Sequence, residues 1–418
     1  MSAFNRTSWQ RFALAIISKL PFFGEAALLV VMRRAINPKA LTLNKVRNFI
    51  LANRESDLKR IQVKSLPYII NMDTINACNL ACPFCVTGTK QLDRKQTRFP
   101  LDQAKAVIDQ VKSHILIARF HNWGEPFLNK ELFKLVRYAH DAGIHTTLSS
   151  NLSISVDNLA EKVVASGLDQ IHVSIDGLKQ ETLERYRRKA DFNLVMKNIR
   201  AIVAEKRRTG SRTPRLELAF LVFRHNEHEV PQLKAMQEEL GVESFTAQSA
   251  FIFHESFVPK ESAFQPGQSI WQDNCHYLYS ELMVEADGHI SPCCTNTSER
   301  FDVGTVAEIG DLHAFWNKPI FSAMRAKSSG QPWKGESGKQ LETLCDYCRY
   351  IGSGKENPTG TLSPLPPALA AAGNQFDHEL DDSGQHVPKK ADKKNSRSQS
   401  ALLSKKVHSV RIDEISIN

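Results

Sequence analysis

Apolar, strand-like runs alternate with amphipathic helical patterns through much of the chain. The pattern predicts strands at Pro67–Ile75, Ile115–Trp123, Ile144–Ser150, Asp169–Asp176 and Arg215–Phe223. It predicts helices at Lys130–Ala142, Val156–Ser166, Phe192–Arg208 and Glu229–Leu240. Such alternation is typical of a parallel α/β sheet or barrel. Active sites on these barrels lie at the C-terminal ends of the strands, so the residues that directly follow each strand are the candidates for chemistry.

Three cysteines follow the first predicted strand. Cys78, Cys82 and Cys85 have the spacing C-x3-C-x2-C. Thiolates hold iron–sulfur clusters, and a fully protein-ligated cubane takes four of them, so three leave one iron open. A zinc knuckle and three unrelated buried cysteines are the alternatives. Zinc sites usually close with four ligands, and this segment offers no His and no fourth Cys.

The spacing resembles the signature of the radical S-adenosylmethionine (SAM) superfamily. The resemblance implies a [4Fe–4S] cluster on Cys78, Cys82 and Cys85, whose open iron binds the amino and carboxylate groups of SAM. It also implies that an electron from the cluster cleaves SAM to a 5′-deoxyadenosyl radical. Phe84 matches the aromatic position of the signature, where the backbone lies near the adenine, and packing beneath the cluster loop is compatible with that role.

Gly124, Glu125 and Pro126 end the second predicted strand. They resemble an element of the same superfamily that meets the amino group of SAM, for which Glu125 would be the acceptor. Taken alone, Gly-Glu-Pro is only a turn. Its place one strand after the cysteine loop favours the SAM contact.

Polar residues also end the third and fourth predicted strands. Asn151 follows the third, and Ser174 and Asp176 share one face of the fourth. They resemble superfamily positions that contact the SAM carboxylate or ribose. Asn151 and Asp176 suit a helix cap or an Asx-turn equally well. Arg187 is a further candidate, because its guanidinium could pair with the SAM carboxylate.

A second set of cysteines lies in the last third of the chain: Cys275, Cys293, Cys294, Cys345 and Cys348. The stretch resembles the SPASM/twitch extension of radical SAM enzymes. The short twitch form carries one auxiliary [4Fe–4S] cluster on four cysteines, which implies Cys275, Cys293, Cys345 and Cys348 here. A zinc ribbon is the alternative. Cys294 is left over, either as a small buried hydrophobe or as a hydrogen donor to a product radical.

The net charge of +9 on 418 residues is unevenly placed. Residues 1–65 hold twelve Lys and Arg against three Asp and Glu, which accounts for the whole surplus. The near-neutral remainder argues against a bulk nucleic-acid substrate. Eight cysteines in a chain of this size do not suggest a disulfide framework, and oxygen-sensitive clusters imply a reducing compartment, most simply the cytoplasm.

The basic N-terminal region also contains apolar runs, Phe12–Ile17 and Ala26–Met32. Both are shorter than the ~20 residues that span a bilayer, and no clear signal-peptide cleavage pattern follows them. These segments either pack on the barrel or lie on the anionic inner face of a membrane as a peripheral contact. From Gly352 onward, Pro-rich and then Lys-rich composition predicts a disordered tail.

We therefore predict four regions: a basic helical region at 1–65, a radical SAM core at 66–265, a twitch/SPASM-like domain at 266–352 and a disordered tail at 353–418. The expected fold is a partial (β/α)6 TIM-like barrel with a small Cys-rich domain. The first functional hypothesis is oxidation or epimerisation of a small polar substrate, such as a sugar or aminocyclitol, with flavodoxin or ferredoxin as reducing partner. The alternatives are maturation of a ribosomal peptide and a non-catalytic zinc-binding interaction protein.

Overall fold

The computed structural model describes residues 32–33, 35–250, 252, 254–261, 264, 274–335, 341–348, 378–380 and 386–388. The predicted run Phe12–Ile17 lies outside these residues, as does Ala26–Met32 apart from Met32 itself. None of the described helices is long and apolar enough to cross a membrane.

One nine-stranded sheet organises the molecule, in the order β6-β5-β4-β3-β2-β1-β7-β8-β9. Strands β1 to β6 are parallel to their neighbours, and β7 adds to the free side of β1, also in parallel. Strands β8 and β9 continue the sheet antiparallel. The bounds are β1 Ile69–Met72, β2 Ile117–Arg119, β3 His145–Ser150, β4 Gln170–Ser174, β5 Arg215–Val222, β6 Ser244–Ser249, β7 Glu281–Val284, β8 His289–Ser291 and β9 Gly304–Thr305. This is the predicted partial (β/α)6 barrel, extended by strands of the Cys-rich part.

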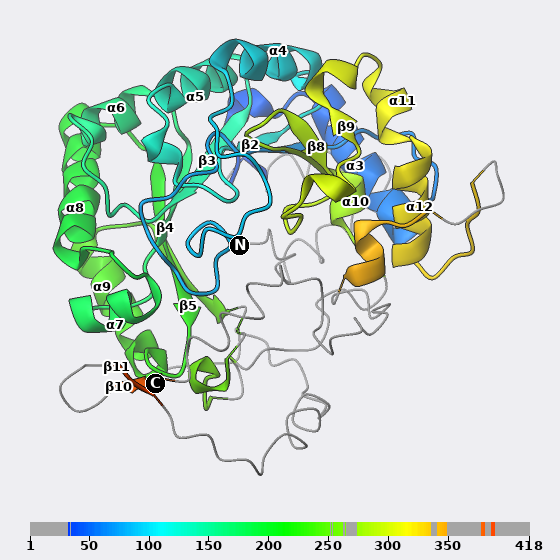
Figure 1. Cartoon of the computed structure of the whole chain (residues 1–418). Coiled ribbons are helices and arrows are strands. Elements are labelled where there is room, and N and C mark those ends of the chain that lie inside the picture. The colour runs from blue at the N-terminus through cyan, green and yellow to red at the C-terminus, as the bar shows by residue number, and fades with distance from the viewer. Residues whose placement is uncertain are drawn as a thin grey trace.

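Helices cover the outer side of the curved sheet (Figure 1). Their bounds are α4 Leu101–Val111, α5 Leu132–Asp141, α6 Leu159–Ala165, α7 Gln180–Tyr186, α8 Phe192–Thr209 and α9 Leu233–Leu240. The longest, α8, begins where the Asp191 side chain accepts from the Leu194 N–H and ends at Gly210, whose φ of 68° suits glycine. Short 3-10 turns occur at Pro38–Ala40, Pro126–Leu128, Glu227–Gln232, Glu255–Phe257, Glu299–Phe301, Val306–Glu308 and Leu344–Tyr347.

The two faces of the sheet differ in polarity. Alternate strand residues such as Ile70, Ala118 and Val173 are buried in one core with the helices. The opposite positions face the inside of the barrel and form what we call the inner sheet face: Asn71, Arg119, Thr147, His172 and Glu217. Register pairs Asn71 with Arg119, Arg119 with Thr147, and His172 with Glu217. Strands of parallel sheets are commonly apolar on both faces, so this polar inner face is a departure from the usual pattern.

Helix α3 (Leu43–Asp57) closes the N-terminal end of the barrel. Its Val46 and Ala52, both fully buried, form a second core with Ile69 and Ile117 at the start of β1 and β2. The Lys45 ammonium donates to the Gly143 carbonyl at 2.7 Å, just before β3. The residues from Ile36 to Asp57 therefore pack on the barrel, which is one of the two arrangements expected for the N-terminal region.

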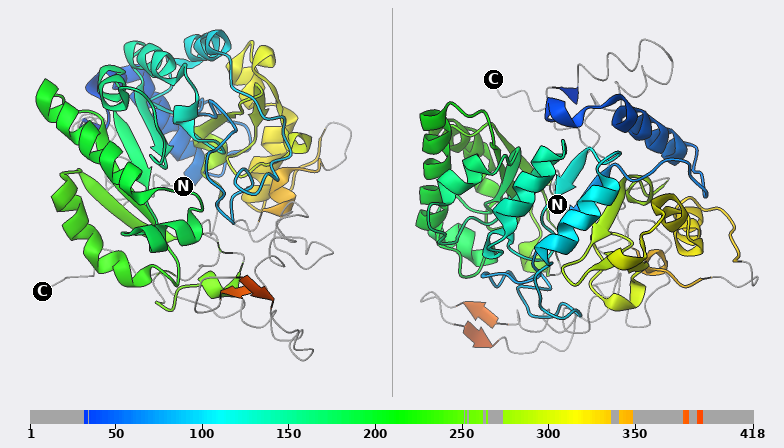
Figure 2. Two further views of the ribbon diagram at one scale, coloured as in Figure 1. Left: turned by 60° about the vertical axis from the view of Figure 1, so that its left-hand side comes forward. Right: turned by 90° about the horizontal axis from the view of Figure 1, so that it is seen from above.

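One buried arginine connects the Cys-rich part to the segment that precedes β1. The Cys-rich part contains α10 Tyr277–Ser280, α11 Leu312–Trp316 and α12 Pro319–Ser328. Arg325 of α12 has no exposed surface and donates to the carbonyls of Ile61, Leu278 and Trp316. Figure 2 shows the Cys-rich part, in yellow, on the side of the molecule where α3, in blue, also lies. Because the sheet runs on through β7, the predicted boundary at 265/266 remains a prediction.

The predicted disordered tail lies outside the described residues except for two short strands. β10 (His378–Leu380) and β11 (His386–Pro388) pair antiparallel. Apart from this pairing, the disordered tail remains a prediction.

Removing α3 should destabilise the barrel. A chain shortened to begin at Lys64 loses Val46 and Ala52 and exposes Ile69 and Ile117 to water. Each lost core contact of this kind costs about 2–5 kcal/mol, so we expect the unfolding temperature to fall by at least about 10 °C. The matched control is a chain that begins at Met32 and keeps α3. Equal unfolding temperatures of the two chains by circular dichroism would contradict this account.

Candidate functional site

The cysteine loop directly follows β1, at the C-terminal end of the barrel. It is held by local contacts: the Leu80 N–H donates to Cys78 Sγ at 3.4 Å, and the Cys85 N–H donates to the Cys82 carbonyl at 3.2 Å. Gly88 lets the chain fold back on itself, because a Cβ there would lie 2.7 Å from the Cys82 backbone. The loop thus brings three sulfur ligands to the barrel mouth, where sequence analysis expected them.

The three thiols influence one another electrostatically. The pKa of Cys78 is raised to about 11 and that of Cys82 to about 12, chiefly by burial; Cys85 contributes to both shifts and Cys78 to that of Cys82. The Arg187 guanidinium acts in the opposite direction on both. Soft sulfur ligands gathered in a partly buried loop, with one cation nearby to offset thiolate charge, fit a [4Fe–4S] cluster with three protein ligands.

Gly124 allows the end of β2 to touch the cysteine loop. A Cβ at Gly124 would lie 1.7 Å from the Ile75 carbonyl oxygen, so no other residue fits without moving the backbone. The next residue, Glu125, donates its N–H to the Ala77 carbonyl at 2.8 Å. Pro126 then starts the short turn Pro126–Leu128, in which Glu125 is the N-cap. The Gly-Glu-Pro turn is therefore a docking point for the loop that carries Cys78.

The Glu125 carboxylate connects β2 with β3. It is 2% exposed and accepts from Ser150 Oγ at 2.7 Å, the Asn151 N–H at 2.9 Å and the Phe127 N–H at 3.2 Å. Burial raises the pKa of Glu125 to about 7, although these hydrogen bonds oppose the shift. The carboxylate lies close enough to Cys78 to raise the pKa of that thiol. A remaining lone pair on Glu125 is thus placed near the cluster loop, as a contact with a SAM ammonium requires.

Asn151 forms the Asx-turn that was one of its two expected roles. Its Oδ1 accepts from the Ser153 N–H at 2.8 Å, and its Nδ2 donates to Asn79 Oδ1 at 3.0 Å. The same amide lies 3.9 Å from Cys78 Sγ. At the end of β4, Ser174 Oγ lies 3.1 Å from Ser149 Oγ on β3. The contacts of Asn151 and Ser174 with SAM remain predictions.

Asp176 pairs with Arg187, at a separation of 2.6 Å. The carboxylate is fully buried, and its other oxygen accepts from the Leu221 N–H at 2.7 Å. Burial alone would lower the pKa of Arg187, but Asp176 and Cys82 raise it overall, so the guanidinium is charged. Asp176 therefore orients Arg187 in this structure. A direct contact between Asp176 and SAM remains a prediction. Arg187 is partly exposed beside the cysteine loop and is well placed to bind an anionic group.

Phe84 lies in an aromatic cluster at the same mouth. Its ring centroid is 4.9 Å from that of Phe257 and 5.8 Å from that of Tyr186, which directly precedes Arg187. Phe223, at the end of β5, stacks closely on Tyr186 at 4.3 Å. The packing beneath the cluster loop that sequence analysis considered is thus present, and it links the loop to β5.

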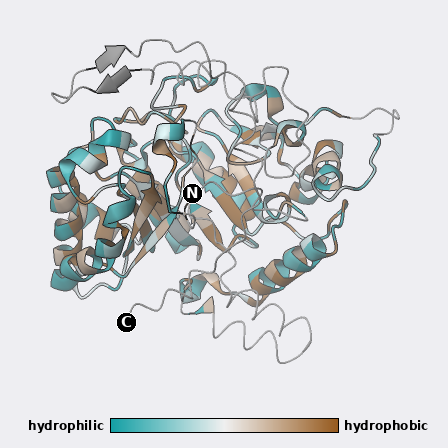
Figure 3. Ribbon diagram, turned by 90° about the horizontal axis from the view of Figure 1, so that it is seen from below, coloured by the Kyte–Doolittle hydropathy of each residue, from teal (hydrophilic) through white to brown (hydrophobic). Residues whose placement is uncertain are grey.

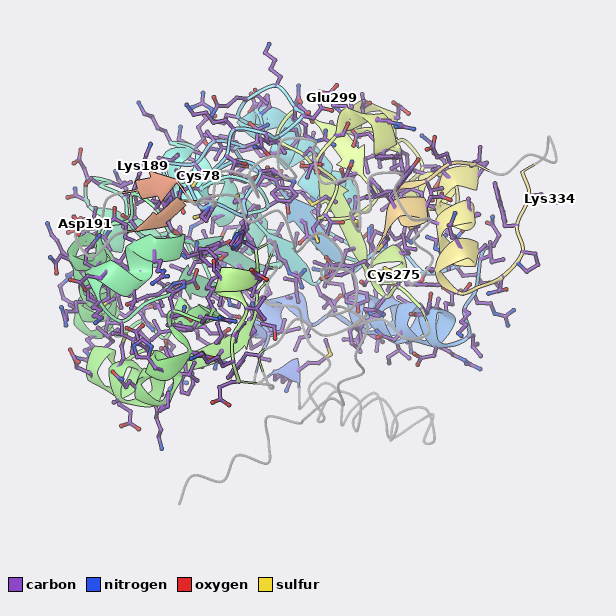
Figure 4. The ribbon with its side chains drawn as sticks, turned by 60° about the horizontal axis from the view of Figure 1, so that its bottom comes forward. Cys78, Lys189, Asp191, Cys275, Glu299 and Lys334 are labelled. Atoms are coloured by element: carbon purple, nitrogen blue, oxygen red, sulfur yellow. The ribbon has the colours of Figure 1, made fainter. Side chains whose placement is uncertain are left out.

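The second cysteine set divides into four and one. Burial raises the pKa of Cys275, Cys293 and Cys345, and each of these thiols feels the charge of Cys348. Cys294 instead feels Cys293, Glu281 and Arg119. Each of these four thiols is therefore within electrostatic reach of at least one other, and their assignment as the ligands of one iron–sulfur cluster remains a prediction. Figure 4 shows Cys78 and Cys275 in different parts of the molecule, which separates the two sets. Among the described residues, no three His, Cys, Asp or Glu side chains are arranged to hold a single metal ion.

Several buried polar groups near the site carry no motif, and sequence analysis missed them. Arg119 pairs with Glu281 at 3.0 Å, and Asn71 donates to the same carboxylate at 2.6 Å. Asp73 and Glu285 follow β1 and β7 and are each 1% exposed. Burial raises the pKa of both, that of Glu285 to about 7, and Glu285 raises the pKa of Asp73 further. The sequence pattern that could have revealed such residues is a polar residue at alternate positions of a strand that is otherwise apolar.

Two family profiles match the chain. The radical SAM superfamily matches residues 72–230, and an iron–sulfur cluster-binding domain, SPASM, matches residues 275–349. The first match contains the three cysteines of the loop after β1, and the second contains the five cysteines of the second set.

Curated relatives are distant. Fe-coproporphyrin III synthase of Methanosarcina barkeri is 23% identical over 303 residues, which is 64% of this chain and 73% of the relative. PqqA peptide cyclase of Bradyrhizobium diazoefficiens is 22% identical over 230 residues, 54% of this chain and 57% of the relative. The chain therefore spans less than two thirds of the peptide cyclase.

Solved structures show a similar fold. Streptococcus suis SuiB bound to S-adenosylmethionine superposes with a TM-score of 0.53 and 14% identity, covering 73% of this chain and 79% of SuiB. SuiB bound to its precursor peptide SuiA gives a TM-score of 0.52 at 14% identity, with 78% and 81% covered. At these identities the likeness concerns the fold alone.

We predict that Cys293 and not Cys294 is a cluster ligand. Cys293→Ala should lower the iron content of anaerobically purified protein by about four atoms per chain, because the auxiliary cluster loses one of its four thiolates. Cys294→Ala is the matched control and should keep the wild-type iron content. The reverse result would move the ligand assignment to Cys294.

Glu125→Ala should weaken SAM binding. A charge-assisted hydrogen bond contributes roughly 1.5–3 kcal/mol, which corresponds to about one to two decades in affinity. Ser150→Ala is the control, because it removes one bond to the Glu125 carboxylate and keeps the charge. Equilibrium binding of SAM to the anaerobic protein measures both. A dissociation constant for Glu125→Ala no weaker than that for Ser150→Ala would restrict Glu125 to a structural role.

Proposed function

We propose that this chain, which belongs to the radical SAM superfamily and carries a C-terminal SPASM iron–sulfur domain, oxidises or epimerises a small polar molecule such as a sugar or an aminocyclitol. The observation that carries the proposal is the polarity of the inner sheet face. Ligand sites are usually mostly apolar with a few polar groups, so a barrel interior lined by ion pairs and hydroxyls favours a substrate with many polar atoms.

The interior offers both donors and acceptors. His172 Nδ1 lies 3.4 Å from Glu217, and Thr246 donates to the same carboxylate at 2.8 Å. His121, which follows β2, has its pKa lowered well below the usual value by burial and by His172 and Arg119. Its imidazole is therefore neutral, and its buried Nδ1 has no hydrogen-bond partner among the described residues. A substrate hydroxyl group is a suitable partner for this nitrogen.

The cysteine loop and the Cys-rich part supply places for the cofactors. When bound, the three-cysteine cluster and SAM supply reductive SAM cleavage and hydrogen-atom abstraction, and the auxiliary cluster supplies a second redox centre. This chain's own residues then bind and orient: Arg187 faces anionic groups at the mouth, and Glu125 accepts from a cation beside Cys78. Arg119, Glu281 and Cys294 lie together, so Cys294 is the candidate donor of a hydrogen atom if the reaction is an epimerisation.

Peptide modification is the second candidate. It is supported by the similarity to PqqA peptide cyclase and by the fold shared with SuiB, which was solved with its precursor peptide. Many such enzymes bind the peptide through an N-terminal winged-helix domain, whereas residues 43–57 form the single helix α3 packed on the barrel. A porphyrin substrate, suggested by the similarity to Fe-coproporphyrin III synthase, is a broad planar macrocycle with large apolar faces and suits the polar interior less well. The zinc-binding hypothesis has no support in the two matched families.

Deuterium transfer tests the proposed substrate class. Reduced, anaerobic protein is incubated with SAM and either perdeuterated sugars and aminocyclitols or deuterated peptides, and 5′-deoxyadenosine is analysed by mass spectrometry. We expect deuterium from the polyhydroxylated compounds. His121→Ala should lower this transfer about three- to tenfold, because one hydrogen bond to the substrate is lost, and should spare uncoupled SAM cleavage. Deuterium from peptides alone would replace the proposal with the second candidate.

A further inference from the structure

Helix α3 presents an outward face that mixes leucine with arginine. Leu43, Arg47, Ile50, Arg54 and Leu58 follow one another at intervals of three or four residues, so they share one side of the helix. Leu43 is 50% exposed and Leu58 at the C-cap is 54% exposed. Both arginines are exposed and Ile50 is partly exposed. We call these five residues the α3 outer face. Figure 3 shows hydrophobic and hydrophilic residues following one another along this helix.

The surroundings of the α3 outer face are basic. Lys39, Arg60 and Lys64 are exposed on either side of it. Between residues 35 and 64, Asp57 is the one exposed acidic residue, because Glu55 is buried and accepts from the N–H groups of Lys64 and Ser65. This surface therefore contains much of the charge surplus of residues 1–65.

We propose that the α3 outer face binds the surface of an anionic lipid membrane. Basic side chains are attracted to anionic headgroups, and leucines beside them can insert at the boundary between headgroups and acyl chains. The phosphates of a nucleic acid would pair with the arginines but would make no favourable contact with Leu43 and Leu58. Two of the five large hydrophobic side chains that are exposed in the described structure lie on this face.

The chain outside the described residues is suited to the same partner. The sequence before Met32 contains the apolar runs Phe12–Ile17 and Ala26–Met32 among basic residues. It joins the described structure at Met32, which packs with Ile36 and Val46 in the core beneath α3. The upstream segment therefore starts from the same end of the barrel as the α3 outer face, so both can bind one surface.

This docking leaves the candidate site accessible to water. Helix α3 packs at the N-terminal ends of β1 and β2, whereas the cysteine loop follows the C-terminal end of β1. Figure 2 shows α3, in blue, at the edge of the molecule. The membrane contact therefore concerns location and does not rest on the proposed reaction.

Vesicle binding tests the proposal with the full chain. We expect co-sedimentation with phosphatidylglycerol–phosphatidylcholine vesicles, much less with pure phosphatidylcholine, and weakening by salt because exposed charges are screened. Arg47→Gln with Arg54→Gln should weaken binding about 25-fold, since each basic residue near an anionic surface contributes about a factor of five. Leu43→Ser with Leu58→Ser should weaken binding at least tenfold, because two buried aliphatic chains are lost.

The matched control is Arg200→Gln with Arg208→Gln on α8, two arginines that are equally exposed and distant from α3. This pair should bind like the wild type, and all variants should keep wild-type iron content and SAM cleavage. Failure of the wild type to bind anionic vesicles overturns the proposal. The proposal is also overturned if the α3 variants bind vesicles like the wild type but lose binding to single-stranded RNA. The same holds if they bind vesicles like the wild type but lose a dimer that light scattering detects in the wild type.

Discussion

The close approach of Gly124 to the cysteine loop is the constraint on which the rest of the site depends. Because Gly124 has no side chain, the end of β2 lies against the backbone of Ile75 and Ala77. This contact positions the loop that carries Cys78. Glu125 then extends the connection to β3 through Ser150 and Asn151. Three strand ends are thereby held together by one short turn and one buried carboxylate. These contacts hold the cysteine loop in position. A protein orients a cofactor through contacts of this kind, and the cofactor carries out the difficult chemistry.

The sheet combines two environments that usually exclude each other. Its outer face is apolar and packs on the helices, which provides the stability of the barrel. Its inner face carries Arg119, which pairs with Glu281, and Glu217, which accepts a hydrogen bond from Thr246 and lies beside His172. Burying ion pairs adds little stability compared with apolar packing, so their presence here is better explained by a ligand than by folding. Asp176 and Arg187 form another buried ion pair of this kind, and Asp176 keeps the Arg187 guanidinium charged at the mouth of the barrel.

The two ends of the barrel have different tasks. The C-terminal end holds the cysteine loop, the Gly-Glu-Pro turn and the arginine that faces them, and the N-terminal end is closed by α3. In barrels of this kind, the N-terminal end contributes stability and the C-terminal end contributes chemistry. Because α3 uses only one side for packing, its other side is available for a basic, partly apolar surface. The exposed basic residues Lys39, Arg47, Arg54, Arg60 and Lys64 are therefore on the end that lies away from the site.

The sequence by itself determined the features that depend on local spacing. The three cysteines after β1, the five strands from β1 to β5 and the charge of residues 1–65 follow from neighbouring residues, because periodicity and ligand spacing are properties of short segments. Strand β6 was missed, since Ser244–Ser249 is partly or fully exposed along its length and contains only two apolar residues, Phe245 and Ala247. Only the tertiary structure decided through-space partners, such as the pairing of Asp176 with Arg187 and of Arg119 with Glu281. It also decided that α3 packs on the barrel. These outcomes depend on distances between residues far apart in the chain, and no local pattern encodes such distances.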